Sequence, residues 1–154
     1  MISEGSTVPA FVLQDSQGRT VRSEDFSGKK HAIYFYPKDF TPGCTTEADG
    51  FSKSYGEFKS RDIEVIGISP DDVASHGKFC KKMGIPYVLL ADTDKTVSKA
   101  FGVWGMKKFM GREYMGVMRS TFLVNESGII FKVYPKVKPA GHARDVLDEF
   151  DASK

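Results

Sequence analysis

Hydrophobic and polar residues follow two different periods along the chain, and the strand-like period comes first. Residues 10–22 alternate around a Ser-Gln-Gly turn, which predicts a β-hairpin followed by a short turn capped by Ser23. The run HAIYFYP at 31–37 is almost continuously apolar, as in a strand buried on both faces. Further strands are predicted at 63–69 and 87–92, and a second hairpin at 120–135 with its turn at 126–128.

Helical periods separate these strands. After Pro42 and Gly43, apolar residues recur at spacings of three and four, which predicts a helix over 44–60. A second stripe contains His76, Phe79 and Cys80 and stops at a glycine, and helices are expected at 71–84, 94–102 and 142–150. This order of elements predicts one α/β domain over 1–154, with a central mixed sheet covered by helices on both faces.

Composition narrows the class of protein without naming an activity. The chain has 154 residues, 40% hydrophobic and 27% charged, as expected of a globular domain with its own core. A net charge of +2 gives no reason to expect a nucleic-acid or acidic-lipid surface, and no apolar run is long enough to cross a bilayer. The N-terminal residues lack the pattern of a signal peptide, and two cysteines do not make a secreted disulfide scaffold. We therefore expect a cytoplasmic protein.

The segment PKDFTPGC, residues 37–44, places a single thiol at the start of the first long helix. There Cys44 would face unpaired backbone N–H groups and the positive end of the helix dipole, which favour thiolate over thiol. A thioredoxin-type dithiol site would need a second cysteine three positions earlier, where Thr41 stands. The pattern favours a reaction at one sulfur. A buried structural cysteine is the alternative.

A thiolate that attacks a peroxide needs no base, because the peroxide brings its own proton. It does need hydrogen-bond donors, since negative charge develops on the leaving oxygen. The hydroxyl of Thr41 and the amides of Gly43 and Cys44 are predicted donors. Arg119, at the entry to the core strand RSTFLV, is the predicted cation.

These residues also carry a resemblance. The spacing Pro37-x-x-x-Thr41-x-x-Cys44 matches the active-site motif of the peroxiredoxins. FYPKDFTPGCTTEA and FGVWGMKKFMGREYMGVMRSTFLV resemble two signatures of the peroxiredoxin Q branch, also called bacterioferritin comigratory proteins, and the similarity covers almost the whole chain. The resemblance implies a thioredoxin-like fold and peroxide reduction at Cys44, supported by Pro37, Thr41 and Arg119. It also implies that Glu47 orients the arginine, although a first-turn acid could simply favour the helix dipole.

The chain departs from the branch at one position. Many members carry a resolving cysteine five residues after the first, where this sequence has Asp49. Cys80 is the other thiol, and the chain resembles a subgroup whose resolving cysteine lies on that later helix. This resemblance implies a Cys44–Cys80 disulfide that a thioredoxin or similar dithiol reduces. Cys80 also shares an apolar stripe, so an inert core thiol is the alternative.

The resemblance implies reduction of hydrogen peroxide and organic hydroperoxides by a monomer or weak dimer, without a cofactor. The three histidines are far apart in sequence and show no metal-ligand spacing with the cysteines. Phe40 and Trp104 belong to a group that either packs in the core or forms an apolar rim over the pocket; its other members are Phe109, Met110, Tyr114 and Met115. Two other functions stay open: a one-cysteine peroxidase that uses an external thiol, and a non-enzymatic redox sensor.

Overall fold

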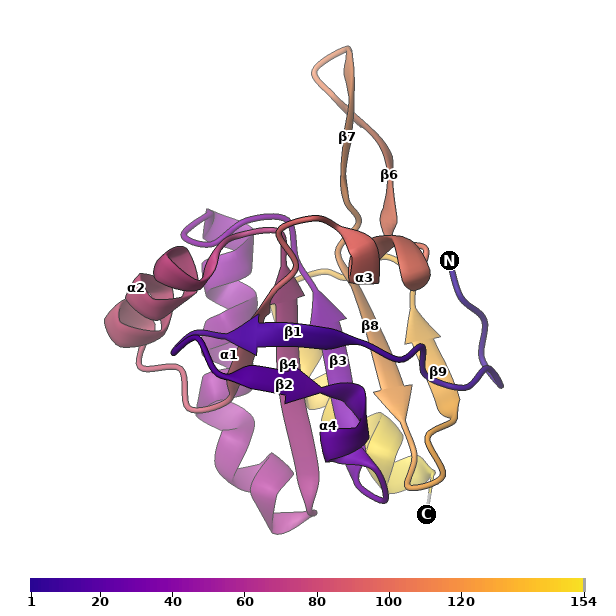
Figure 1. Cartoon of the computed structure of the whole chain (residues 1–154). Helices are drawn as coiled ribbons and strands as arrows, with labels where there is room; N and C mark the ends of the chain where they lie inside the picture. Colours follow the sequence, from indigo (N-terminus) through magenta and orange to yellow (C-terminus); the bar gives the residue numbers. More distant parts are fainter. Residues whose placement is uncertain (154) are drawn as a thin grey trace.

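A mixed seven-stranded sheet forms the centre of the computed structural model, which describes residues 1–153 (Figure 1). Its strand order is β2-β1-β5-β4-β3-β8-β9. The three central strands β3, β4 and β5 run parallel, while β8, β9 and the β1–β2 hairpin pair antiparallel. The strands span Val12–Asp15 (β1), Thr20–Arg22 (β2), Lys30–Phe35 (β3), Ile63–Ser69 (β4), Val88–Ala91 (β5), Ser120–Val124 (β8) and Ile130–Tyr134 (β9).

Helices cover both faces of this sheet, as predicted. They span Pro42–Ser60 (α1), Val73–Met83 (α2), Thr96–Ala100 (α3) and His142–Ala152 (α4), and the 3-10 helix η1 spans Ser23–Phe26. The buried strand β3 sends Ala32 and Tyr34 into a core shared with α1, α2 and α4, and Ile33 and Phe35 into the core on the α3 side. None of the helices within residues 1–153 has the length and apolar character needed to cross a bilayer.

Local signals explain where the two helices that carry the cysteines begin and end. Helix α1 starts at Pro42, two residues before the predicted start, because proline suits the first helical position and Thr41 takes the extended N-cap conformation. Helix α2 is capped by Asp72, whose side chain accepts a hydrogen bond from the Ser75 amide at 2.8 Å. It ends at Gly84, which adopts the left-handed conformation at φ 64°.

The turn after the first hairpin differs from the prediction. Arg22 is the N-cap residue of η1, and Ser23 is its first helical residue. The Ser23 hydroxyl instead accepts a hydrogen bond from the backbone amide of Phe11 at 3.0 Å. Ser23 therefore ties η1 to the chain that leads into β1.

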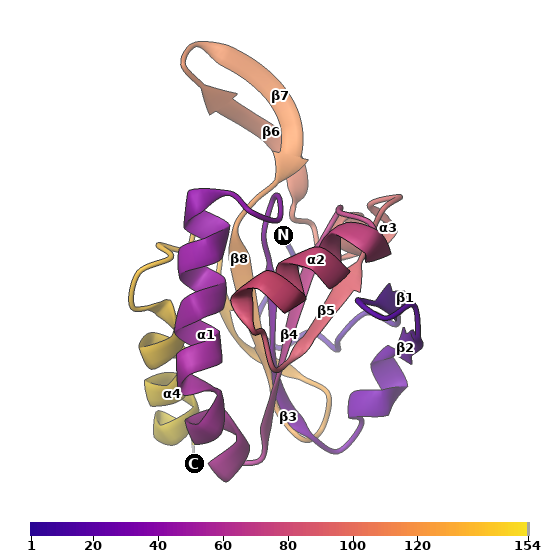
Figure 2. The same ribbon diagram turned by 90° about the vertical axis from the view of Figure 1, so that its left-hand side faces the viewer.

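The hairpin of β6 and β7, absent from the sequence prediction, stands apart from the main sheet. Its strands β6 (Trp104–Phe109) and β7 (Arg112–Val117) pair only with each other among the described residues. The connection at Met110 and Gly111 has positive φ at both residues, as in a type I′ turn. Figures 1 and 2 show the hairpin projecting from the end of the molecule where α1 begins. Large apolar side chains are exposed along it, namely Met106, Phe109, Met110, Tyr114 and Met115, so these residues do not form core.

Candidate active site

Strand pairing brings the predicted sulfur and the predicted cation together. Cys44 lies in the first turn of α1, directly after the loop that leaves β3, and only 1% of its surface is exposed. Arg119 immediately precedes β8, whose Ser120 pairs with Phe35 at the end of β3. The Arg119 Nη2 atom donates a hydrogen bond to Cys44 Sγ at 3.2 Å. A buried thiolate at this position would have a charged donor in contact with it.

Glu47 holds the other side of the guanidinium. It lies three residues after Cys44 on α1 and is 1% exposed, and its Oε1 accepts a hydrogen bond from Arg119 Nη1 at 2.7 Å. One cation therefore faces two groups that can carry negative charge. Burial raises the pKa of Glu47 to about 7, while Arg119 acts in the opposite direction. Burial lowers the pKa of Arg119, but Cys44 and Glu47 outweigh it, so the guanidinium stays charged.

Gly43 makes the approach of the arginine possible. A Cβ atom at this position would lie 3.0 Å from Arg119 Nη2 and 3.5 Å from the ring of Pro139. A larger residue would push the guanidinium away from Cys44 Sγ. The Pro-Gly-Cys order thus combines a helix start with room for the cation.

The Thr41 hydroxyl is not the free donor that the sequence analysis expected. Its hydrogen is donated to the carbonyl of Lys38 at 2.8 Å, within the loop itself. This bond leaves the lone pairs of the Thr41 oxygen available to accept a hydrogen bond. Thr41 therefore faces the site as an acceptor in this structure.

A cavity of about 710 Å³ opens in front of this group. Its apolar wall comes largely from the β6–β7 hairpin, and the loop before α1 supplies Pro37 and Thr41. Trp104 lines the cavity, which is one of the two placements left open by the sequence. Phe40 does not; its ring packs against Phe79 of α2, with centroids 5.0 Å apart. The lining residues are Pro37, Lys38, Thr41, Pro42, Gly43, Pro70, Lys95, Trp104, Lys107, Phe109, Tyr114, Met115, Gly116, Val117 and Arg119.

Comparison with known proteins agrees with this arrangement. A model of the AhpC/TSA family matches residues 5–133. The chain belongs to that family. It is 44% identical over 146 residues to peroxiredoxin Bcp of Bacillus subtilis, covering 95% of this chain and 93% of the relative. It is 39% identical over 147 residues to peroxiredoxin Bcp of Escherichia coli, with 96% and 94% covered.

Solved peroxiredoxin structures share the fold over almost the whole chain. A Cys→Ser variant of PrxQ from Xylella fastidiosa has a TM-score of 0.94 at 33% identity, covering 99% of this chain and 98% of that chain. A Cys→Ser variant of peroxiredoxin Q from Xanthomonas campestris has a TM-score of 0.89 at 38% identity, with 94% and 92% covered. These likenesses confirm the thioredoxin-like fold and the peroxiredoxin Q branch. The protein is a thiol-dependent peroxidase.

The second thiol of this peroxiredoxin lies on α2 and is not bonded to Cys44. Both cysteines are free, and Cys80 is half-buried. Burial raises the pKa of the Cys80 thiol, and a hydrogen bond with Ser16 in the β1–β2 turn acts in the opposite direction. Helix α2 packs closely on that turn, since a Cβ at Gly77 would lie 3.3 Å from the Ser16 carbonyl.

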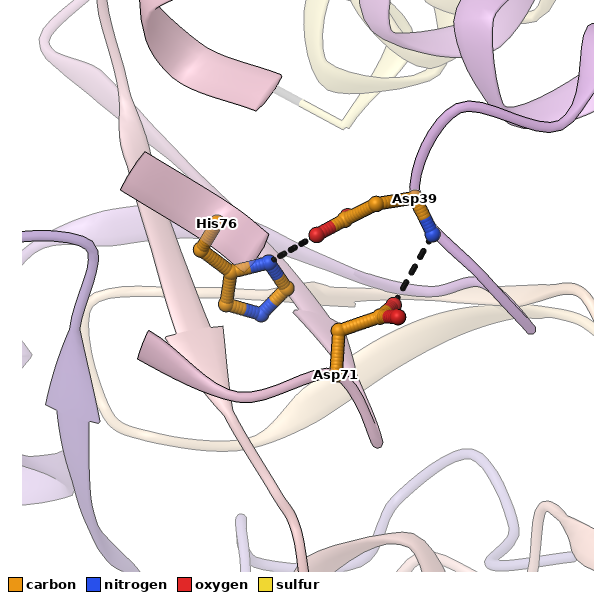
Figure 3. Close-up of side chains that lie close together, drawn as sticks. All are labelled: Asp39, Asp71 and His76. Carbon is orange, nitrogen blue, oxygen red and sulfur yellow. Dashed lines mark hydrogen bonds and ion pairs between the residues drawn. The ribbon is translucent and has the colours of Figure 1, made fainter. Parts of the chain in front are cut away.

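A cluster that the sequence analysis missed lies between the Cys44 loop and α2 (Figure 3). Asp39 accepts hydrogen bonds from the His76 ring at 2.7 Å and from the Ser75 hydroxyl at 2.8 Å. The Asp71 carboxylate accepts one from the Asp39 amide at 2.8 Å. Asp39 and His76 are buried, at 3% and 0% exposure. One sequence signal could have drawn attention to His76. It lies four residues before Cys80 and therefore on the same side of α2.

The same three residues could in principle hold a metal ion, since one ligand atom from each lies within 4.8 Å of the others. Both carboxylate oxygens of Asp39, both ring nitrogens of His76 and one oxygen of Asp71, however, already have hydrogen-bond partners. The His76 ring bonds Asp39 and the Leu90 carbonyl, and Asp71 bonds the Asp39 amide and the Ser69 hydroxyl. Hydrogen bonding therefore accounts for the cluster without an ion.

Proposed function

We propose that Cys44 is the peroxide-reducing residue of this enzyme. The observation that supports this most directly is the 3.2 Å contact between Arg119 Nη2 and a buried sulfur in the first turn of a helix. The thiolate attacks one peroxide oxygen, the O–O bond breaks, and the other oxygen leaves with a proton as water or alcohol. Cys44 becomes a sulfenate, which takes up a proton from water to give the sulfenic acid. Arg119 stabilises the charge on the leaving oxygen, and Glu47 fixes the orientation of the guanidinium.

In this reaction Thr41 accepts a hydrogen bond from the proton that the peroxide carries, since its own hydrogen is used at Lys38. Pro37 closes the cavity beside it. Thr41→Val is therefore expected to slow the peroxide step by about tenfold or more, because the acceptor is lost. Thr41→Ser keeps the oxygen and is expected to react at nearly the wild-type rate. Stopped-flow fluorescence measures both, and equal rates in the two variants would show that the hydroxyl has no part in the reaction.

The cavity wall suggests the kind of peroxide. Trp104, Phe109, Tyr114 and Met115 give it an apolar surface next to the sulfur. A solved structure of the bacterioferritin comigratory protein of Xanthomonas campestris, 38% identical, is described in terms of its alkyl peroxide reduction activity. We propose that this enzyme reduces organic hydroperoxides as well as hydrogen peroxide.

Cys80 is the proposed resolving residue. Its sulfur attacks the sulfur of the Cys44 sulfenic acid, the S–O bond breaks, the hydroxyl leaves as water with the Cys80 proton, and a disulfide forms. Two Cys→Ser variants of the Xanthomonas campestris enzyme have been solved, at positions separated by the same 36 residues as Cys44 and Cys80. The protein uses a thiol reductant; we propose a thioredoxin-type dithiol. We also propose a monomer or weak dimer in the cytoplasm.

Intact mass after one equivalent of peroxide tests the resolving step. The wild type is expected to lose the mass of two hydrogens, which indicates a disulfide. Cys80→Ser is expected to gain one oxygen and stop, because its sulfenic acid has no internal partner. Gain of oxygen in the wild type would favour the one-cysteine peroxidase. Failure to consume excess peroxide with thioredoxin and its reductase would favour the redox sensor.

A further inference from the structure

Two consecutive residues of the Cys44 loop hold helix α2 at the turn that leads into Cys80. Asp39 bonds the ring of His76 at 2.7 Å. Phe40 packs edge-on against Phe79 with ring centroids 5.0 Å apart. His76 and Phe79 lie one helical turn apart on α2. The loop before Cys44 therefore contacts the turn of α2 that directly precedes Cys80.

Further hydrogen bonds hold both members of the buried pair in place. The Nε2 atom of His76 lies 2.9 Å from the carbonyl of Leu90, which can only accept, so this nitrogen carries a hydrogen. Asp39 accepts from the Tyr36 hydroxyl at 2.7 Å and from the Ser75 hydroxyl at 2.8 Å. The contact between Asp39 and His76 is therefore one hydrogen bond in a fully buried network, out of contact with water.

The loop is held against a backbone preference. Phe40 has φ 66°, a left-handed conformation that a bulky residue rarely adopts. Phe40 is also 45% exposed, so burial of its side chain explains little of this conformation. The bonds of the preceding residue hold the strained loop in place, since both the carboxylate and the amide of Asp39 are bound.

Formation of a disulfide requires both held segments to move. The two Cα atoms must approach to within about 7 Å. Cys44 starts in the first turn of α1, under Arg119, whereas Cys80 starts on α2 beside the β1–β2 turn. The hydrogen bond between Asp39 and His76, drawn in Figure 3, joins the loop before Cys44 to the helix that carries Cys80. If either segment moves alone, the contact between Asp39 and His76 breaks. If the contact holds, the two segments must move together.

We propose that the buried hydrogen bond between Asp39 and His76 is a latch that holds the peroxide-reducing arrangement closed and sets the rate at which Cys80 reaches the Cys44 sulfenic acid. Asp39 and His76 are then positioning residues for the resolving step, and neither touches the peroxide. The inference rests on the resolving role proposed for Cys80. The latch also decides how long the sulfenic acid is exposed to a second peroxide, and thus how much sulfinic acid forms.

Single and double neutral variants test the latch. Asp39→Asn and His76→Gln each replace one member of the pair by an uncharged amide, and Asp39→Asn/His76→Gln replaces both. Each is expected to speed disulfide formation by about tenfold or more, since a buried polar group that loses its hydrogen-bond partner destabilises the closed arrangement. The double variant should be no faster than the singles, because the two residues act as one pair. Ser75→Ala removes one bond to Asp39 and keeps the pair, so a smaller effect in the same direction is expected.

Two phases are followed after mixing with peroxide, by fluorescence of the single tryptophan Trp104, which lines the cavity, and by mass after acid quenching. The resolving phase should accelerate, while the peroxide phase should change by less than about threefold. The sulfinic fraction at high peroxide should fall in proportion. Ser98→Ala is the matched control, since it removes a hydrogen bond to another buried aspartate, Asp92, and Ser98 lies on helix α3. It should leave both phases as in the wild type.

Hydrogen exchange separates failure of the latch from failure of the resolving role. In a Cys80→Ser background no disulfide can form, and Asp39→Asn should still increase exchange at 37–50 and 73–83 above the rest of the chain. If folded Asp39→Asn and His76→Gln variants keep the wild-type resolving rate and exchange, the latch is refuted while Cys80 keeps its role. If the wild type forms no disulfide, the resolving role and its control by the latch both fail. Slower resolution in the variants would also contradict the proposal.

Discussion

Replacing Arg119 with methionine is expected to slow the reaction of Cys44 with peroxide by about 100-fold or more. The guanidinium donates to Cys44 Sγ at 3.2 Å and to Glu47 at 2.7 Å. Methionine would leave the sulfur without a charged donor, both as a thiolate and when charge moves to the leaving oxygen. The fold should survive, because a buried Glu47 that loses its cation can take up a proton. Stopped-flow fluorescence gives the rate constant, and ultraviolet absorbance gives the thiolate fraction.

Two further arginine variants separate charge from geometry. Arg119→Lys keeps the charge but loses the planar fork that reaches both partners, so an intermediate rate is expected. Arg144→Met removes an exposed arginine that pairs with Glu57 and Asp148, and should leave the rate unchanged. A folded Arg119→Met protein that reacts at the wild-type rate would exclude this residue from the reaction.

Raising the pH from 4.5 to about 7 is expected to lower the free energy of unfolding by about 3 kcal/mol through Glu47. Burial raises the pKa of this carboxyl from 4.5 to about 7, against the effect of Arg119. Between these values the unfolded chain ionises while the folded chain keeps its proton. The stability contributed by the protonated group is therefore complete below pH 4.5 and is lost as the pH rises through 7.

Denaturant unfolding of the wild type and Glu47→Gln across this range measures the effect. Glutamine keeps an oxygen for the Arg119 hydrogen bond but does not titrate, so the variant should lose about 3 kcal/mol less over the same interval. His142, whose pKa is lowered by burial to about 4, makes stability rise with pH in both proteins. The difference between the two curves therefore isolates Glu47. Parallel curves would show that its carboxyl is ionised throughout.

The predictions that depend only on residues close together in the sequence agree best with the structure. The start of α1, the glycine that ends α2 and the turn at 126–128 follow from local patterns, and the structure has all three within two residues. The contact of Arg119 with Cys44 spans 75 residues, and its expectation came from a charge at the entry to a core strand together with a family motif. Thr41 was assigned as a free donor because the bond of its hydroxyl to Lys38 depends on the shape of the loop.

Two features of the structure could not be predicted from the periodicity of hydrophobic residues. The β6–β7 hairpin packs on no other strand of the described chain, so its side chains do not alternate between core and water, and its Met-Gly turn is a weak hairpin signal. The Asp39–His76 pair joins a loop to a helix 37 residues away. His76 looked like one member of an apolar stripe because the sequence does not show which buried acid will meet it.

The antiparallel pairing of β3 with β8 has a consequence for how the protein acquires its activity. Because this register places Arg119 beside Cys44, and a slip of one residue would turn each side chain of β8 to the opposite face, the sulfur gains its cation only when β8 docks correctly. Contacts of such long sequence separation form late, after the cost of closing a long loop has been met. A nascent or partly folded chain thus lacks the contact between Arg119 and Cys44, and rapid reaction with peroxide is expected only from the completed fold.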